Sequence, residues 1–476
     1  MKLYNRAAAM LLLPLLLITG CMSVPAPEVE SSTISAVESA PEDTVPLQPV
    51  WTLGYGSVEI PLPDASAGPL YIAGYQNGAE ITGTLDLPRV NAVWLEADGQ
   101  KILLFSVDCV ALASDTVAKI RETLSDFRAE TGCSFIGVTA THTHAGIDTL
   151  GLWGPAGVEG KNASYMENLI LSAKEAADIA YESRTEGKLY YSATETNMME
   201  HDSRDPYVFD PNIYQLRFSP ADEAKSGIRL LTFGAHAESL RGDNTLLSRD
   251  FPGVMCDLIK AETGDDAVFF PGAVGGLIMT RVFCIGEFDA KENLERTGLR
   301  MARTVLEADP AAETEVAPTL SYARMEFDVP LDNPLFMAYG ALGILGNQLL
   351  DGSGASGYDV RSEVAAIALG DVTIVQIPCE IFPELVTGEG LQEGDPEPLF
   401  AIAESLGREK VIVMGLSNDE LGYVVPPSDF LLNEKAPYVE RVKGGGEDHY
   451  EETNSVGPLA APLLAETVRS VLELLK

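Results

Sequence analysis

The sequence predicts an α/β protein in which mixed β-sheets are flanked by helices. Short apolar runs rich in β-favouring residues recur along the chain, as in 133–140, 228–233 and 411–414, and indicate buried strands. Apolar residues at helical spacing lie between an earlier predicted strand and the run 133–140. A strand–helix–strand unit of this kind favours two parallel strands joined by a right-handed crossover. Other runs are joined by tight-turn signals, which predict antiparallel hairpins.

The first 21 residues predict a targeting segment rather than part of the fold. Lys2 and Arg6 supply positive charge ahead of an apolar run, 7–18, that is too short to span a bilayer permanently. The run leads into Thr19-Gly20-Cys21, and a small pair before a cysteine is typical of bacterial lipoprotein signals. We therefore expect 1–21 to be a lipoprotein signal whose lipidated Cys21 anchors an extracytoplasmic chain to a bacterial membrane. The alternative is an ordinary secretory signal with a coincidental cysteine.

Residues 22–50 predict a disordered tether, because they are rich in Pro, Glu, Ser and Thr and poor in large apolar residues. Folded sequence begins near Trp51, and 51–476 is long enough for one large catalytic domain. The remaining cysteines predict neither a disulfide framework nor a CxxC zinc site, and we expect them to be small apolar fillers. They are Cys109, Cys133, Cys256, Cys284 and Cys379.

The net charge limits the class of partner. The chain has 32 Lys and Arg against 71 Asp and Glu, a formal charge of −39. Such a surface repels phosphate backbones and anionic headgroups, which argues against nucleic-acid binding. It favours a neutral or cationic substrate. No protein partner can be inferred from the sequence.

The first part of the folded region predicts a hairpin followed by a strand–helix–strand unit. Residues 90–96 and 101–107 read as strands on either side of a four-residue turn signal. We expect Ser114 to cap a helix that ends at Gly132, after which 133–140 forms the next strand. The apolar residues at helical spacing are Val117, Ile120, Leu124 and Phe127.

Further along the chain we expect a long helix over 164–183, a helix starting near Pro252 and a closing helix over 457–475. The remaining predicted strands are 189–194, 213–219, 267–270, 319–331, and the hairpin 363–369 with 372–377. Two glycine-rich stretches leave alternatives open. Residues 151–155 form either an ordinary turn, which we favour, or a groove lining. Residues 333–358 form either a plain helix, which we favour, or a lid over a lipid groove.

Histidine is scarce, with 5 in the chain, and two of them follow the strand 133–140 directly. Residues two apart in an extended stretch point the same way, so His142 and His144 can face one cavity. One would bind a metal and the other would work beside it. In the alternative, one histidine caps the strand and the other is exposed.

Three more polar residues follow predicted strands: His236, Glu380 and Tyr423. Two histidines and a carboxylate are a common ligand set for a catalytic zinc with an open position, although the HExxH spacing is absent. A single zinc requires the ring nitrogens of His142 and His236 to lie within roughly 5 Å of each other. The other two histidines, His201 and His449, are expected to be exposed.

Five short motifs, in this order, resemble the neutral/alkaline non-lysosomal ceramidase family, and the resemblance runs from about Trp51 to the C-terminus. They are Thr139-Ala140-Thr141-His142-Thr143-His144-Ala145-Gly146, Phe233-Gly234-Ala235-His236, Ile377-Pro378-Cys379-Glu380, Gly415-Leu416-Ser417-Asn418 with Gly422-Tyr423, and Tyr450-Glu451-Glu452 with Gly457-Pro458. The first is fairly specific, and the others gain weight as an ordered set.

The resemblance implies a ceramidase-like catalytic domain and a zinc amidase that splits ceramide into a sphingoid base and a fatty acid. It implies that His142, His236, Glu380 and Tyr423 hold Zn²⁺ and that His144 lies beside the metal. Zinc would activate a water and polarise the amide carbonyl. His144 could shuttle the proton to the leaving amine, and Tyr423 could ligate the metal or hydrogen-bond the oxyanion.

The sequence departs from the family pattern at three points. The segment Pro271-Gly272-Ala273-Val274-Gly275-Gly276 stands where family members carry a serine-asparagine-glycine-aspartate loop, which argues against a serine-based step and leaves a zinc–water mechanism intact. No C-terminal immunoglobulin-like domain is expected. The segments around the site differ as well, so the substrate need not be ceramide.

We therefore expect hydrolysis of a linear amide, with ceramide or a related N-acyl lipid as substrate. One alternative is a zinc hydrolase of a small non-lipid amide or ester. The other is a non-catalytic binding lipoprotein of the same fold.

Overall fold

The computed structural model describes residues 49–475, apart from 197–199, 277, 281–288 and 445–446. The expected signal sequence, Cys21, nearly all of the tether and Cys284 lie outside the described residues. The described part begins its regular structure at Trp51, the first residue of β1, where folded sequence was expected to start.

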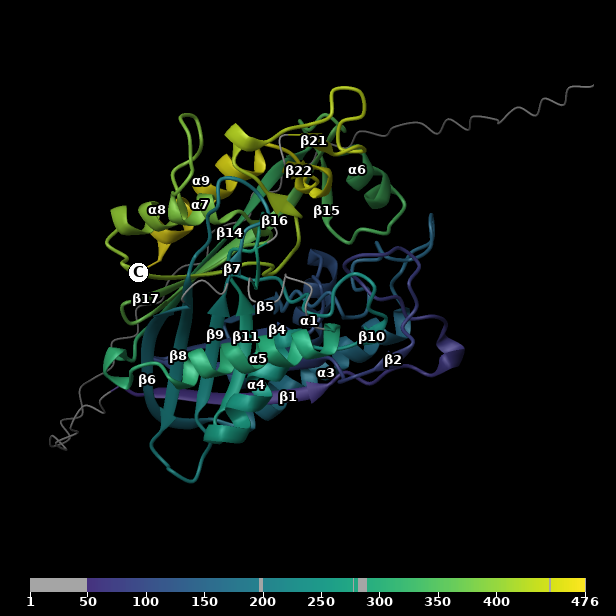
Figure 1. Ribbon diagram of the computed structural model, residues 1–476. Coiled ribbons are helices and arrows are strands. Elements are labelled where there is room, and N and C mark those ends of the chain that lie inside the picture. Colours follow the sequence, from purple (N-terminus) through teal and green to yellow (C-terminus); the bar gives the residue numbers. More distant parts are fainter. Residues whose placement is uncertain (1–48, 197–199, 277, 281–288, 445–446, 476) are drawn as a thin grey trace, which may run out of the picture. The chain divides into compact units, whose positions relative to one another are not determined.

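A nine-stranded mixed sheet holds most strands of the first half of the chain (Figure 1). Its order is β11-β9-β8-β6-β1-β3-β4-β5, with β13 paired to β6. The pairs β4–β5 and β9–β11 are parallel, and the others are antiparallel. The bounds are β1 (Trp51–Glu59), β3 (Arg89–Ala97), β4 (Gln100–Val107), β5 (Phe135–Ala140), β6 (Thr185–Glu195), β8 (Asn212–Pro220), β9 (Ile228–Phe233), β11 (Asp266–Pro271) and β13 (Thr314–Val316).

A second sheet has five strands in the order β14-β16-β17-β19, with β15 paired to β16. Only β17 and β19 are parallel. The bounds are β14 (Leu320–Leu331), β15 (Gln348–Asp351), β16 (Tyr358–Leu369), β17 (Val372–Gln376) and β19 (Lys410–Met414). The predicted hairpin of 363–369 with 372–377 is confirmed as β16 and β17.

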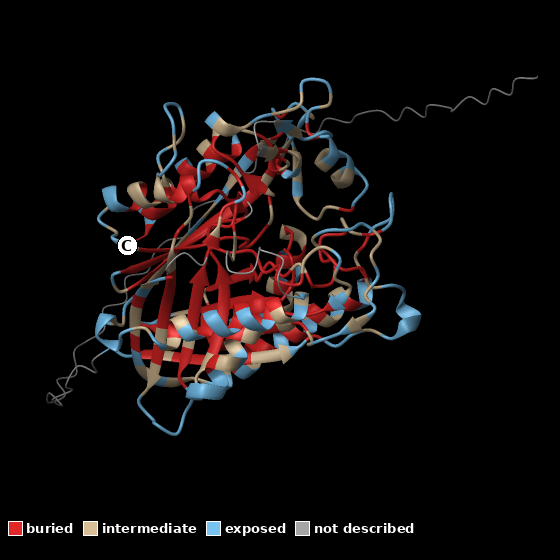
Figure 2. Cartoon of the chain, viewed as in Figure 1, coloured by how far each residue is buried: buried red, intermediate tan, exposed pale blue. Residues whose placement is uncertain are grey.

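The two sheets pack face to face, and helices cover their outer faces. Leu95 of β3 and Ile367 of β16 belong to the core between the sheets, whereas Trp94 of β3 packs toward the helices. Because successive side chains point to opposite faces, strands covered on both sides read as continuous apolar runs. Figure 2 shows the buried strands between helices whose outer surfaces are exposed.

The helices fall into three groups. Those over the larger sheet are α1 (Ser114–Thr123), α2 (Ser125–Thr131), α3 (Ala163–Ser183), α4 (Asp250–Thr263) and α5 (Ala290–Leu306). Those beside the second sheet are α7 (Pro383–Thr387), α8 (Leu399–Ser405) and α9 (Ala460–Leu474). The remaining helix, α6 (Pro334–Ala341), follows β14. Among the described residues, no helix combines the length and the apolar composition that a membrane crossing requires.

The larger sheet curls until its two ends approach each other. The strand β11, at one end of the order, lies against β4 and β5 at the other end. The Ser106 hydroxyl of β4 donates a hydrogen bond of 2.6 Å to the Phe269 carbonyl of β11. The right-handed twist between neighbouring strands accumulates across a wide sheet and produces such curvature. The carboxyl ends of β5 and β9 are thereby brought to one region.

Local predictions are wrong in two segments, 114–132 and 333–358. Ser114 is the first residue of α1 rather than its cap, because the Asp419 side chain accepts from the Ser114 backbone N–H at 2.7 Å and takes the capping role. The helix also breaks at Leu124 into α1 and α2. Residues 333–358 form a helix only as far as Ala341, beyond which Gly343 has a φ of 73° and the chain turns into β15.

Candidate metal centre

Four loops at the carboxyl ends of strands bring the expected site residues together. His142 and His144 follow β5, and His236 follows β9. Glu380 and Tyr423 open the two short strands β18 (Glu380–Ile381) and β20 (Tyr423–Val424). The loops bind one another through their backbones; for example, the N–H of His144 donates to the carbonyl of Ala237 at 2.9 Å.

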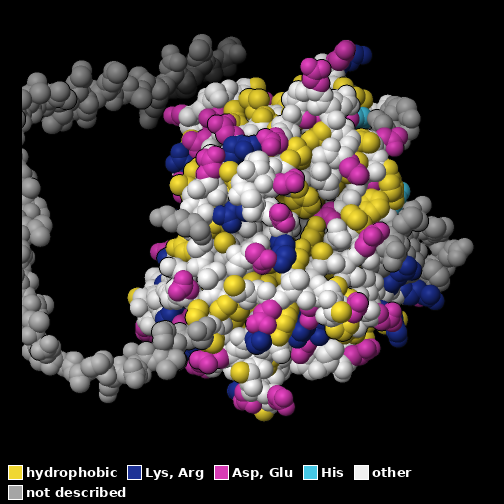
Figure 3. Space-filling view, turned by 90° about the vertical axis from the view of Figure 1, so that its left-hand side faces the viewer, with side chains coloured by type: hydrophobic (Ala, Val, Ile, Leu, Met, Phe, Trp, Pro, Cys, Tyr) yellow, Lys and Arg dark blue, Asp and Glu magenta, His cyan; other side chains and the backbone are white. Residues whose placement is uncertain are grey.

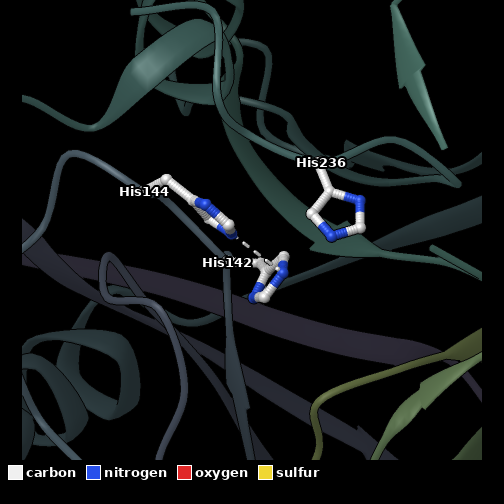
Figure 4. Close-up of side chains that lie close together, drawn as sticks. All are labelled: His142, His144 and His236. Carbon is white, nitrogen blue, oxygen red and sulfur yellow. Dashed lines mark hydrogen bonds between the residues drawn. The ribbon is translucent and has the colours of Figure 1, made fainter. Parts of the chain in front are cut away.

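The three histidines form a tight group (Figure 4). One ring nitrogen from each of His142, His144 and His236 lies within 4.8 Å of the others. The Nε2 atoms of His142 and His144 are 3.2 Å apart. His142 and His236 are buried. The distance required for one zinc to bind both His142 and His236 is therefore met.

The outer nitrogens of two histidines are held by backbone carbonyls. His142 donates from Nδ1 to Val110 O at 2.8 Å, and His236 donates from Nδ1 to Ile278 O at 3.1 Å. A carbonyl can only accept, so Nδ1 carries the proton and Nε2 faces the centre. This is the orientation that protein partners impose on metal-binding histidines. His142 adopts a φ of 63°, a left-handed conformation that turns the chain sharply after β5.

Glu380 completes the arrangement from β18, which follows β17 of the second sheet and pairs with β20. Its Oε2 lies 3.3 Å from His142 Nε2 and 3.1 Å from His236 Nε2. Burial raises the pKa of Glu380, but the two histidines outweigh burial and hold the pKa far below its usual range. Burial lowers the pKa of His236, but the hydrogen bond with Glu380 and the negative charges of Glu380 and Glu238 together raise it above its usual value.

This set of atoms fits a zinc ion. Ligands near 2 Å from a tetrahedral ion lie about 3.3 Å apart, and the separations of Glu380 from the two histidine nitrogens are of that size. Nitrogen and carboxylate oxygen are both zinc ligands. His142, His236 and Glu380 would hold the ion.

Tyr423 lies beside this group. Its hydroxyl is 3.4 Å from His236 Nε2 and 2.8 Å from the hydroxyl of Tyr450. Burial raises the pKa of Tyr423 well above its usual value, and the nearby charges of Glu380 and Tyr450 raise it further. The position suits either a fourth ligand or a hydrogen-bond donor to a bound carbonyl.

His144 is enclosed by Tyr75 and Glu238, two residues that no pattern in the sequence placed together. The Tyr75 ring meets it edge-on at 5.2 Å, and the Tyr75 hydroxyl is hydrogen-bonded to Glu238. Glu238 Oε2 lies 4.0 Å from His144 Nδ1. Burial lowers the pKa of His144 well below its usual value, as do the neighbouring His142 and His236.

Glu238 was overlooked because its segment reads as a polar surface loop, yet the residue is only 7% exposed. The signal that could have found it is its spacing: it follows His236 by two residues, as His144 follows His142. His449, expected to be exposed, is buried, and its Nδ1 lies 2.7 Å from Arg204 and 3.0 Å from Glu452.

An apolar groove of about 590 Å³ opens from the histidines. Residues 151–155 form bends that lead into a turn at 156–157, and Leu152 and Trp153 line the groove, which is the alternative that the sequence left open. The other apolar lining residues include Val110, Leu150, Leu331, Leu335, Phe336, Tyr339, Leu345, Leu349, Val360 and Val456. The volume falls in the range of small-molecule sites.

The segment 271–276, which differs from the family pattern, packs against the strand that carries Glu380. The N–H of Gly275 donates to Ile381 O at 2.8 Å. A Cβ on Gly275 would lie 2.5 Å from the backbone nitrogen of Phe382, so only glycine allows this approach. Here the segment supports the Glu380 loop through its backbone.

The fold resembles that of solved neutral ceramidases. The neutral ceramidase from Pseudomonas aeruginosa matches with a TM-score of 0.68 at 15% identity, over 89% of this chain and 74% of that chain. A structure of ceramidase complexed with C2 matches with a TM-score of 0.64 at 16% identity, over 89% of this chain and 75% of that chain. No protein-family model matches the sequence, and neither does any curated protein. The likeness confirms the expected fold, mixed sheets flanked by helices as in a ceramidase-like catalytic domain.

Proposed function

We propose that this chain is a zinc-dependent hydrolase of a linear amide bond, with ceramide or a related N-acyl lipid as its substrate. One observation carries the proposal: His142, His236 and Glu380 converge at the end of an apolar groove. The likeness of the fold to neutral ceramidases supports the same reaction class.

The groove favours a lipid over a small polar amide or ester. Its lining is mostly aliphatic and aromatic. The polar lining residues include His142, His144, Glu238, Glu380, Tyr423 and Tyr450, with Asn77, Asn347, Glu420, Arg441, Thr453 and Asn454. A long acyl chain gains free energy for each methylene that leaves water, about 0.8 kcal/mol when fully buried. A short acyl chain would leave much of this surface unused.

The residues suggest a division of tasks. When bound, zinc lowers the pKa of a coordinated water and polarises the amide carbonyl. His144 faces the same space through Nε2 and can accept a proton there and pass it to the leaving nitrogen. The Tyr423 hydroxyl can donate a hydrogen bond to the carbonyl oxygen as negative charge develops. The groove holds the acyl chain and excludes water from it.

We also propose that the chain works outside the cytoplasm, held to a membrane by lipid on Cys21. The support is the sequence alone: a charged start, a short apolar run and a small pair before the cysteine. The excess of 39 negative charges supports a neutral or cationic substrate rather than nucleic acid.

Metal content and turnover test the proposal. We expect about one zinc per chain, most of it lost in His236→Ala and retained in the control His201→Ala, because His201 lies in β7 (Glu200–His201), outside the cluster. N-acyl substrates of increasing chain length should show rising kcat/KM. No zinc even after supplementation would refute the mechanism. Zinc with substrate binding but no turnover would identify a binding lipoprotein, and a preference for short chains would favour the small-amide alternative.

A further inference from the structure

We propose that residues 334–350, here called the rim segment, dock on the surface of a zwitterionic lipid bilayer. A lipid substrate would then pass from the bilayer into the groove without crossing water. The docking surface follows from the exposure, composition and position of the segment, and its purpose rests on the proposed function.

The rim segment is free of charge in an unusually acidic chain. From Asn333 to Leu350 there is no Asp, Glu, Lys or Arg, although charged residues make up 22% of the sequence. A stretch of this length would carry about four at the average frequency. Asp332 and Asp351 flank it on either side. Surface segments of soluble proteins are ordinarily rich in charge, so this composition indicates an apolar partner.

The rim segment is also exposed. Ile344 is the sole buried residue within it. Leu342 is 70% exposed and Leu335 is 37% exposed. The helix α6 is apolar around its whole circumference yet has no buried residue. A helix of that kind normally lies in a protein core or in lipid, whereas α6 packs against the core only through the partly buried Phe336 and Met337.

The rim segment forms one wall of the groove mouth. Leu335, Phe336 and Tyr339 of α6 line the groove. On the neighbouring loop, Trp153 lines the same groove and Val158 is 55% exposed. The loops touch, because the Lys161 ammonium donates to the Ile344 carbonyl at 3.0 Å. Tryptophan and exposed aliphatic residues are enriched where proteins meet the membrane interface.

The net negative charge of the chain indicates which kind of lipid surface the rim segment can bind. Acidic side chains are spread over the face shown in Figure 3, interspersed with fewer basic ones. A chain with a net charge of −39 is repelled by anionic lipids and by a second copy of itself. A zwitterionic bilayer has no such penalty, and it offers the apolar environment that the rim segment lacks.

The test measures vesicle binding, which needs no turnover. The chain would be prepared without residues 1–21, because the contacts of the described fold lie within Pro49–Lys476 and a lipid anchor would mask the effect. Phosphatidylcholine vesicles would be floated with the parent chain and with a double variant, Ala338→Glu with Leu342→Glu. Both residues are exposed and neither lines the groove. The matched control is Leu171→Glu with Ile179→Glu on α3, where the leucine is 54% and the isoleucine 38% exposed.

We expect the rim variant to lower the vesicle partition coefficient by about tenfold or more, because an apolar leucine side chain that leaves water for lipid is replaced by a charged one. The α3 control should bind as the parent does. Replacing half of the lipid with phosphatidylglycerol should weaken binding at low salt. Turnover of a soluble short-chain amide should be the same in the parent and the rim variant.

Equal vesicle binding by the parent and the rim variant would overturn the proposal. So would a parent dimer that becomes monomeric in the rim variant, because the rim segment would then be an interface between two copies. A chain that binds vesicles through the rim segment but hydrolyses no amide would retain the docking surface and refute the proposed function instead.

Discussion

Glu380 and Tyr423 are register partners in the short parallel pair of β18 and β20, although they lie in different parts of the chain. The N–H of Glu380 donates to Gly422 O, and the N–H of Phe382 donates to Val424 O, both at 3.1 Å. This pairing presents a carboxylate and a phenol side by side to the histidines that follow β5 and β9 of the larger sheet. The candidate centre is therefore assembled from the larger sheet and from the β18–β20 pair that follows strands of the second sheet, rather than on one sheet.

Replacing Glu380 with glutamine should weaken zinc binding by more than roughly 10–100-fold. That smaller loss is typical when the mutated residue only hydrogen-bonds to a metal ligand. The amide keeps the shape but removes the negative charge between His142 and His236. Competition with a chelator of known affinity measures the change. Glu363→Gln is the control, because Glu363 is also buried but pairs with Arg121. Equal zinc affinity in both variants would rule out Glu380 as a ligand.

Tyr423→Phe should lower zinc affinity by about tenfold or more and reduce kcat, if the hydroxyl is the fourth ligand that the resemblance implies. Tyr450→Phe is the matched control, because Tyr450 hydrogen-bonds to the Tyr423 hydroxyl at 2.8 Å and is not one of the expected ligands. It should leave zinc content unchanged. A Tyr423→Phe chain with full zinc affinity and reduced kcat would instead assign Tyr423 to oxyanion stabilisation.

The stability of the chain should fall as pH rises from about 5 to 8, partly through Glu384. Burial raises the pKa of this carboxyl from its usual 4.5 to about 8, with Asp202 and Asp429 adding to the effect. Within this range the folded chain holds a proton that the unfolded chain has released, so rising pH favours unfolding. Glu384→Gln should remove this loss.

The expected gain from Glu384→Gln is roughly 2–5 kcal/mol in the free energy of unfolding at pH 8, with little change near pH 4.5. Denaturant titrations at the two pH values measure it. A gain that is the same at both pH values would show that the effect is one of packing rather than of ionisation.

Arg204→Leu should destabilise the fold by about 3–5 kcal/mol, because it leaves buried carboxylates without their cation. The Arg204 guanidinium lies 3.1 Å from Glu451 and 2.8 Å from Glu452, with side-chain exposures of 4%, 2% and 0%. Arg361→Leu is the control: its partner Asp328 is on the surface, and such pairs contribute about 0–1 kcal/mol. Urea unfolding of both variants gives the comparison, and similar losses would contradict the assigned role.

Much of the fold could be predicted because the strands are covered on both faces. The runs 133–140 and 411–414 are largely apolar; β5 lies within the first, and β19 covers the second with one more residue, Lys410. The hairpin of β3 and β4 could also be predicted, because Asp98-Gly99 is a typical turn sequence. Both residues adopt the positive φ values that such a turn requires. Where a distant residue decides the local structure, prediction failed: Asp419 caps α1, and the sequence near Ser114 holds no sign of it.

The sequence by itself determined which residues stand at strand ends: His142, His144, His236, Glu380 and Tyr423. Only the tertiary structure decided that these ends meet. The strands β5 and β9 lie far apart in the order of the larger sheet, and accumulated twist is what brings their ends together. Glu238 reads as a surface residue for the same reason, since burial depends on how distant segments pack against it. Local patterns specify the elements, but convergence depends on sheet curvature and on the packing of two sheets.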